Sequence, residues 1–411
     1  MRERSELGDL EIIDPDHYAA HGYPHAAWAR LRREAPIHRF ESFAPLPFWA
    51  VTKQRHITLI SRQPALFANA PRTEIVAAAD APQVHGLITM DPPEHGRFRK
   101  LVAARFTSRS LEPVRRQIEA VAGAALDALA GRGREGECEF VEAVAEPFPV
   151  AVIAWMLGVP REDWPDARRW TNEVVGALDP EFQRGEESAQ ATQARAVREM
   201  LGYLGALLRR RRADPRDDLL SFLARAELDG APVADEDLLA FAVLLLVAGN
   251  ETTRNATSGG LVAFLEHPGE WERLRRDPTL LPSAVEEILR WTSPVVHFVR
   301  TATADVELES QKIRAGDALA LFYPSANRDE DVYPDPFAFR VDRRPNPHIA
   351  FGVGEHICLG AHVARLELRV IFAHLLRRLE HAELAGPVER LRSATVGGLK
   401  RVPIRYRLSS G

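Results

Sequence analysis

Residues 347–360 read Pro-His-Ile-Ala-Phe-Gly-Val-Gly-Glu-His-Ile-Cys-Leu-Gly, and a helix-forming run follows directly behind them. The cysteine of this stretch, Cys358, is surrounded by Gly352, Gly354 and Gly360. Glycine tolerates positive φ angles and lets the backbone approach a flat group without a Cβ atom in the way. A thiolate just before a helix is stabilised by the free N–H groups of the first turn. The stretch therefore predicts a soft, anionic axial ligand.

One cysteine cannot complete a tetrahedral zinc site, which usually takes four Cys and His ligands, whereas one thiolate is enough for a haem iron. A buried structural cysteine is the alternative, because free cysteine is among the most buried residue types. The pattern Phe351-Gly352-x-Gly354-x-His356-x-Cys358-x-Gly360 resembles the haem-binding signature of cytochromes P450, with every position filled. The resemblance implies haem b as the cofactor and Cys358 as its iron ligand. It also implies haem contacts from Phe351, Gly352, His356, Gly360 and Ala364.

The resemblance extends over nearly the whole chain, from about Asp14 to Arg407. It implies a mainly α fold with small antiparallel β-sheets, built as a single cytochrome P450 domain over residues 1–411. The composition agrees, because 411 residues with 45% hydrophobic side chains can bury a large core, and neither a repeat nor a long linker divides them. Apolar periodicity predicts helices over 14–36, 111–130, 138–157, 161–178, 189–212, 235–267 and 361–379, and a closing hairpin over 396–404.

Charge and cysteine content exclude several classes of protein. The formal net charge of −5 comes without a basic stripe interleaved with aromatic residues, so nucleic acid is not expected as a partner. Only Cys138 and Cys358 occur, which favours a reducing compartment over a disulfide framework. The start of the sequence lacks the apolar core of a signal peptide. The longest apolar run, 238–249, is short of the roughly 20 residues that span a bilayer. We therefore expect no membrane span and a cytoplasmic location.

His95 and Arg99 lie four residues apart behind Asp91-Pro92-Pro93. Aspartate is a good N-cap and proline fits the first turn of a helix, so this segment is expected to begin a helix. Residues four apart share one helix face and can hold an anion together. A solvated basic face is the alternative interpretation. The resemblance implies that His95 and Arg99, together with Arg300, hold the haem propionates.

The helix predicted over 235–267 is apolar all round in its first half and is therefore expected to cross the core. Ala248-Gly249-Asn250-Glu251-Thr252-Thr253 then interrupts it. A buried acid and alcohol cost several kcal/mol unless they are hydrogen-bonded. They could instead mark the point where the helix leaves the core, with Thr252 bonded back to the helix, although the apolar pattern resumes at Leu261. The segment resembles the Ala-Gly-x-acid-Thr motif of the family. The resemblance implies haem contacts from Ala248 and Gly249, proton delivery by Glu251 and dioxygen activation by Thr252.

Glu287 and Arg290 lie three apart on another predicted helix. Such a spacing usually makes a surface ion pair of little energetic value. The resemblance implies instead a structural pair that braces the core near the haem, joined by a further arginine, Arg340 or Arg343.

Apolar residues from several segments are expected to surround the substrate. Family likeness and apolar character together assign this role to Leu87, Leu244, Val247, Ala248, Val295, Val296, Phe298, Val396 and Gly397. Such a lining suits sterols, methyl-branched lipids, terpenoids and polyketides alike. Polar sequences around residues 249–255 and 325–330 are most like those of P450s that hydroxylate sterols or methyl-branched lipids.

The resemblance implies a monooxygenase that inserts one oxygen atom of O2 into a C–H bond of a small hydrophobic substrate. The chain has no Gly-x-Gly-x-x-Gly motif after a strand and no cysteine cluster, so electrons are expected from a separate ferredoxin with its reductase. A basic face with Arg97, Lys100 and Arg365 is the expected dock. Two alternatives stay open: a peroxide-driven peroxygenase, and a haem-thiolate sensor or carrier that performs no turnover.

Overall fold

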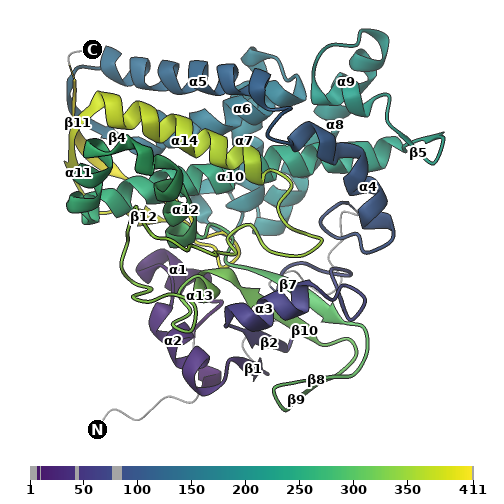
Figure 1. Ribbon diagram of the computed structural model, residues 1–411. Helices are drawn as coiled ribbons and strands as arrows, with labels where there is room; N and C mark the ends of the chain where they lie inside the picture. The colour runs from purple at the N-terminus through teal and green to yellow at the C-terminus, as the bar shows by residue number, and fades with distance from the viewer. Residues whose placement is uncertain (1–6, 10, 42–45, 76–85, 410–411) are drawn as a thin grey trace.

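The structure is a computed structural model, and it describes residues 7–9, 11–41, 46–75 and 86–409. Helices gather in one half of the molecule and a mixed sheet with four short helices fills the other (Figure 1). The helical half contains α4 Glu94–Ala103, α5 Glu112–Gly131, α6 Pro147–Leu157, α7 Trp164–Val175, α8 Ala189–Ala213, α9 Leu219–Leu223, α10 Asp235–Glu266, α11 Pro268–Arg276, α12 Leu281–Thr292 and α14 Ala361–Arg378. The predicted mainly α fold is confirmed.

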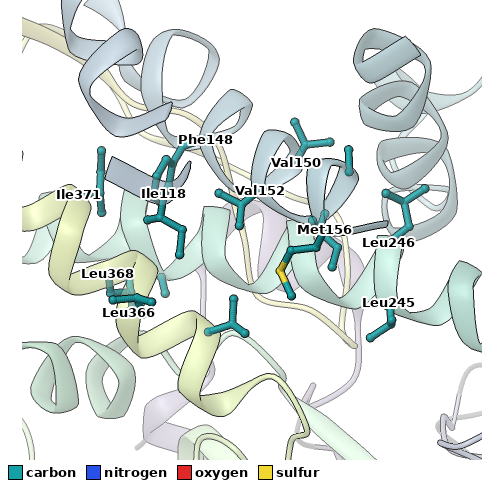
Figure 2. Packing of buried hydrophobic residues seen from close by; sticks show 14 of the residues in the cluster. Ile118, Phe148, Val150, Val152, Met156, Leu245, Leu246, Leu366, Leu368 and Ile371 are labelled. Carbon is teal, nitrogen blue, oxygen red and sulfur yellow. The ribbon is translucent and has the colours of Figure 1, made fainter. Parts of the chain in front are cut away.

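Helix α10 is the centre of the helical half, since α6, α7, α8, α12 and α14 all pack against it. Its 32 residues extend about 48 Å at 1.5 Å per residue. Buried apolar side chains of α5, α6, α10 and α14 pack together here (Figure 2). Labelled examples are Ile118, Phe148, Val150, Val152, Met156, Leu245, Leu246, Leu366, Leu368 and Ile371. The core therefore fixes α10 against the helix that follows the cysteine loop.

The largest sheet has the strand order β1-β2-β10-β7-β3. Its strands are β1 Ile37–Phe40, β2 Phe48–Val51, β3 Phe67–Ala68, β7 His297–Ala302 and β10 Ala318–Phe322. All neighbours pair antiparallel except β2 and β10, which are parallel. Helices α1 Pro15–His21, α2 His25–Glu34, α3 Gln54–Ser61 and α13 Tyr323–Ala326 belong to this half. Strand β7 matters most for the site because it carries Arg300 to the boundary with the helices.

The remaining sheets are small and antiparallel. They comprise β4 Glu135–Glu139 with β11 Leu379–Leu384 and β14 Pro403–Leu408, then β12 Glu389–Arg390 with β13 Leu399–Arg401, β5 Glu227–Leu228 with β6 Ala231–Pro232, and β8 Val306–Leu308 with β9 Gln311–Ile313. The predicted closing hairpin is wrong, because β13 pairs with β12 while β14 lies between β11 and β4. None of the helices in the described ranges is long and apolar enough to cross a membrane.

Three helix predictions need correction. The helix expected over 14–36 is two helices, since Gly22 at φ +76° ends α1 and Pro24 precedes α2. Cys138, expected in a helix, lies in β4 opposite Ile404. Helix α4 begins only at Glu94. Asp91 does not cap it, because the Asp91 carboxylate accepts the N–H groups of residues 69 and 70.

Candidate functional site

A mostly apolar cavity lies between α10, α6, β7 and the cysteine loop, with α4 and α14 completing its wall. Cys358 reaches it from the loop before α14, and Thr252 reaches it from α10. The wall also contains His95 and Arg99 of α4 and Arg300 of β7. Segments far apart in the sequence therefore bring a thiol, an alcohol and several cationic groups to a single cavity.

The loop backbone holds Cys358 in a tight turn. The Cys358 N–H donates to the Phe351 carbonyl at 2.8 Å. Gly352 and Gly354 adopt φ angles of +72° and +83°, a region that side chains make costly. Gly360 has φ −80°, so its value lies in close approach, and a Cβ there would stand 3.9 Å from the Cys358 sulfur. The predicted use of positive φ thus applies to two of these three glycines.

Cys358 is exposed and lines the cavity. Burial raises the pKa of this thiol above its ordinary value, while a hydrogen bond from the Gly360 backbone and the charges of Arg99 and Arg365 oppose the rise. The hydrogen bond and the two arginines therefore lower the pKa of the Cys358 thiol by less than burial raises it. A coordinating metal ion deprotonates a thiol outright, so the geometry suits a sulfur that is bound to a metal.

Four nitrogen-bearing side chains gather at the edge of the cavity. The rings of His95 and His356 stack with centroids 3.9 Å apart. Both His95 ring nitrogens and His356 Nε2 are buried without a hydrogen-bond partner. Arg99 donates to the Ile357 carbonyl at 2.6 Å, and Arg300 donates to the Val299 carbonyl at 2.8 Å and forms a hydrogen bond with Tyr323. Buried donors without acceptors call for a ligand or water.

The charges in this cluster repel one another. Burial, followed by the neighbouring His95, Arg300 and Arg99, lowers the pKa of His356 to about 3. Burial also lowers the pKa of His95, of Arg99 and of Arg300. An anion beside these groups would offset the repulsion and accept hydrogen bonds from the donors that lack a partner. The cluster therefore suits a pair of carboxylates, as on a haem group whose iron is bound by Cys358.

Helix α10 carries its polar interruption inside the core. Glu251 is only 1% exposed, which excludes the alternative that the helix has left the core at this point. The Thr252 hydroxyl does donate back to the Ala248 carbonyl, at 2.9 Å, as that alternative expected. Thr252 lines the cavity, whereas Glu251 lies behind the wall. Burial raises the pKa of Glu251 to about 7, with Arg254 opposing the rise and Glu146 adding to it.

A polar network surrounds the Glu251 carboxylate on the side away from the cavity. Glu251 forms an ion pair with Arg254, which also lies 3.5 Å from Glu146. Arg254 donates to Asn172 at 2.9 Å. Glu146 in turn pairs with Arg168, whose side chain is 43% exposed. The network therefore connects the buried acid with the protein surface.

The residues expected at the substrate divide into two groups. Leu87, Leu244, Ala248, Val295 and Phe298 line the cavity, as do all the residues expected to contact haem: His95, Arg99, Ala248, Gly249, Arg300, Phe351, Gly352, His356, Cys358, Gly360 and Ala364. The other four residues expected at the substrate do not line the cavity: Val247, Val296, Val396 and Gly397.

Each of the four has a physical reason to lie elsewhere. Val296 points into the core behind the large sheet, while its neighbour Val295 lines the cavity, because consecutive residues of an extended segment face opposite sides. Val247 packs against the main helical core. Val396 pairs by backbone with Val295 without lining the cavity. A Cβ on Gly397 would strike the Tyr23 hydroxyl at 2.2 Å, so this glycine makes room for a tyrosine.

The cavity wall also contains residues that the sequence had not indicated. They include Ile153, Met156, Phe241, Tyr323, Thr253 and Glu367. The sequence pattern could have predicted Phe241, because it lies three residues before Leu244 and seven before Ala248, on the same helix face. Glu367 gave a weaker signal, as an acid between Leu366 and Leu368 in an apolar run.

Glu287 and Arg290 form a fully buried ion pair with two contacts of 2.7 Å. Arg343 joins them, donating to both Glu287 oxygens at 3.2 Å. Arg340 contributes only its backbone N–H, at 2.9 Å. Of the two arginines considered from the sequence, Arg343 is therefore the third charged member of the cluster.

Comparison with known proteins agrees with this geometry. Residues 42–407 match the family described as Cytochrome P450. The chain is 35% identical to the linalool 8-monooxygenase of Pseudomonas putida, over 96% of this chain and 98% of the relative. It is 36% identical to the methyl-branched lipid omega-hydroxylase of Mycobacterium tuberculosis, over 98% and 94%.

A solved cytochrome P450 of Mycobacterium marinum in complex with pseudoionone superposes with a TM-score of 0.90, at 34% identity and with 96% and 98% of the two chains covered. The similarity in sequence and structure thus covers both the cysteine loop and the long helix that faces it. This chain belongs to the cytochrome P450 family of haem-thiolate oxidoreductases.

Proposed function

We propose that this P450 monooxygenase inserts one oxygen atom of O2 into a C–H bond of a terpenoid, steroid, branched lipid or polyketide, using electrons from a separate ferredoxin. The observation that carries the proposal is the placement of Cys358 and Thr252 on the wall of one mostly apolar cavity. The thiol supplies an iron ligand, the apolar wall a place for a hydrophobic substrate, and α10 the polar groups that oxygen chemistry needs.

Haem b is the proposed cofactor. Cys358 would ligate its iron, and His95, Arg99, Arg300 and His356 would hold its propionates, which their orphaned donors and mutual repulsion favour. When bound, a haem-thiolate group supplies the chemistry that cleaves dioxygen. The protein side chains then have two tasks: to orient the substrate and to deliver protons.

Proton delivery is assigned to Glu251 and Thr252. A general acid works best with a pKa near the operating pH, and burial raises the pKa of Glu251 to about 7. Thr252 presents its hydroxyl to the cavity while it donates to Ala248. Glu251 does not line the cavity, so the proposed route of its proton to the cavity passes through Thr252 or a water molecule beside it.

The substrate class is drawn from the wall and from the relatives. The cavity wall contains the apolar side chains of Leu87, Phe241, Leu244, Val295 and Phe298. Relatives of similar identity are named for linalool, methyl-branched lipids and steroids. These substrates share a hydrocarbon body, which an apolar wall binds by burial of surface.

An external ferredoxin is the proposed electron source, with both proteins in the cytoplasm. Two of the three basic residues expected at the ferredoxin dock are engaged in ion pairs. Arg365 forms a two-pronged ion pair with Glu286 at 2.8 and 2.9 Å, and Arg97 forms an ion pair with Asp229. Lys100 is exposed and lies on α4, the helix that also carries Arg99. Charge reversal at Lys100 is expected to slow reduction by ferredoxin and to leave reduction by dithionite unchanged.

Two measurements test the proposal. The reduced protein with carbon monoxide is expected to give the red-shifted Soret band of a thiolate-ligated haem, and Cys358→His to lose it. Terpenoids, steroids and branched lipids are then screened for a low-spin to high-spin shift, and those that shift are incubated with ferredoxin, reductase and NADPH. Product in this system supports the monooxygenase. Product with hydrogen peroxide alone would support the peroxygenase, and a normal carbon monoxide band without product in either system would support a sensor.

A further inference from the structure

Glu286 of α12 contacts both ends of the cysteine loop. Its carboxylate lies 3.0 Å from Nε2 of His348, which enters the loop. It also accepts hydrogen bonds at 2.8 and 2.9 Å from Arg365, on the helix that follows the loop. Because Nδ1 of His348 accepts the Ala350 N–H at 3.3 Å, the ring proton lies on Nε2 and is donated to Glu286. Three segments that are separate in the sequence thus meet at one carboxylate.

Glu286 is separate from the ion cluster of the next residue, Glu287. The Glu287 carboxylate is fully buried and pairs with two arginines of its own, whereas the Glu286 side chain is 26% exposed and turns towards the loop. Burial raises the pKa of Glu286, but hydrogen bonds from His348 and Arg365 outweigh it and hold the pKa at about 2. Glu286 is therefore an anion throughout the neutral pH range.

Arg365 connects this carboxylate with the cysteine. Its guanidinium carbon lies 4.5 Å from the centre of the Phe351 ring, and the Phe351 carbonyl accepts the Cys358 N–H at 2.8 Å. Burial is the largest influence on the pKa of the Cys358 thiol, and the Arg365 charge is one of those that oppose it. A cation stabilises negative charge on a nearby sulfur, and an anion paired with that cation offsets the effect. Glu286 therefore limits how strongly Arg365 acts on the sulfur.

We propose that Glu286 is a positioning residue for the haem ligand, which holds the cysteine loop between α12 and α14 and sets the reduction potential of the iron through its ion pair with Arg365. The inference rests on the proposed function, since it needs a haem whose iron is bound by Cys358. Groups that contact a metal ligand from outside orient the ligand and shift the properties of the metal. Positive charge near the iron favours the added electron and negative charge opposes it.

The midpoint reduction potential of the holoenzyme, titrated without substrate or ferredoxin, tests the inference without measuring activity. Glu286→Gln leaves the Arg365 charge uncompensated and is expected to raise the potential. Arg365→Gln leaves the Glu286 carboxylate uncompensated and is expected to lower it. The double variant is expected to lie between the two, and Glu286→Asp, which keeps the charge, closest to the wild type. Shifts of opposite sign in the single variants support the inference, and any other pair of results overturns it.

Glu199→Gln is the matched control. The Glu199 side chain is 33% exposed, close to the value for Glu286, and pairs with Arg169 and Arg195. Hydrogen bonds outweigh burial here too and hold the pKa of Glu199 at about 2. Its arginine partners lie on α7 and α8 rather than beside the cysteine loop. Glu199→Gln is therefore expected to keep the wild-type potential, and a shift as large as that of Glu286→Gln would overturn the inference.

The second readout is the rate at which the reduced carbon monoxide complex loses its red-shifted Soret band in urea below the unfolding transition. This loss is expected to be several-fold faster in Glu286→Gln than in the wild type and in Glu199→Gln, because α12 no longer holds the loop by a charged contact. If Glu286→Gln binds no haem, Arg365→Gln decides alone: a lowered potential supports the inference, and an unchanged or raised one overturns it. A wild-type protein without the red-shifted band would contradict the proposed iron ligand instead.

Discussion

The carboxylate of Glu251 pairs with the guanidinium of Arg254 one turn further along α10, and both side chains are buried. The pair does not make Glu251 a strong acid. Burial is the larger influence and raises the pKa of this carboxyl to about 7, although Arg254 lowers it. Glu146, on the other side of Arg254, adds to the rise. The protonation of Glu251 is therefore set by burial and by two charged groups, Arg254 and Glu146, whose effects can be separated.

Substitution of Arg254 and of Glu146 is expected to move the pH profile in opposite directions. A general acid loses activity as the pH rises through its pKa. Arg254→Gln removes the cation that lowers the pKa of Glu251, so turnover should persist to higher pH than in the wild type. Glu146→Gln removes a negative neighbour and should shift the loss to lower pH. The measurement is product formation against pH with saturating ferredoxin. Shifts of the same sign in both variants would contradict this electrostatic account.

Removal of Glu287 is expected to destabilise the protein strongly. Breaking a buried ion pair leaves an uncompensated charge and costs about 3–5 kcal/mol, and Glu287→Gln would leave both Arg290 and Arg343 without their shared carboxylate. The measurements are the denaturation midpoint and the haem content of the purified protein. Arg340→Gln is the control, because its side chain is 51% exposed and its bond to Glu287 comes from the backbone. Equal losses in the two variants would show that the buried charge is not the cause.

Glu367→Gln is expected to stabilise the folded protein at neutral and alkaline pH. The folded-state pKa of about 8 lies above the ordinary value of 4.5, so the folded protein holds a proton that the unfolded chain releases. Wild-type stability therefore falls as the pH rises from about 4.5 to about 8 and does not fall further through this group. Between pH 5 and pH 8 the advantage of the glutamine variant should grow by about 3 kcal/mol. Urea unfolding at several pH values measures it, and an advantage that does not change with pH would contradict it.

Prediction from the sequence succeeded where a motif is local. The cysteine stretch 347–360 and the polar interruption 248–253 of α10 are each short and continuous in the sequence, and side chains from both meet at one cavity. His95 and Arg99 share a helix face, and the structure brings them to Arg300 from another half of the fold. The resemblance supplied that long-range connection, because spacing within one helix cannot show what packs against it.

Prediction failed where position depends on a partner element. Apolar character alone does not tell which way the residues just before β7 point, so Val296 was expected at the cavity although it belongs to the core behind the sheet. Gly397 was taken as a pocket residue, yet its missing side chain accommodates Tyr23, which lies far away in the sequence. Cys138 follows a helix-like pattern, but pairing with β14 draws it into a strand. In each case tertiary contacts outweigh local preference.

The glycines of the cysteine loop are expected to differ in their tolerance of alanine. Gly352 and Gly354 share positive φ, which costs a side chain about 1–2 kcal/mol. At Gly352 the nearest atom to an added Cβ is 3.8 Å away, so this cost is the whole effect. At Gly354 the Cβ would lie 2.2 Å from the Ser61 carbonyl oxygen, and backbone must move. Gly354→Ala is therefore expected to lose several kcal/mol of stability, and Gly352→Ala only about 1–2 kcal/mol. Haem content and thermal unfolding measure the difference. Gly360→Ala is the control, because Gly360 has a negative φ angle. Equal losses in Gly352→Ala and Gly354→Ala would show that the contact with Ser61 does not limit the loop.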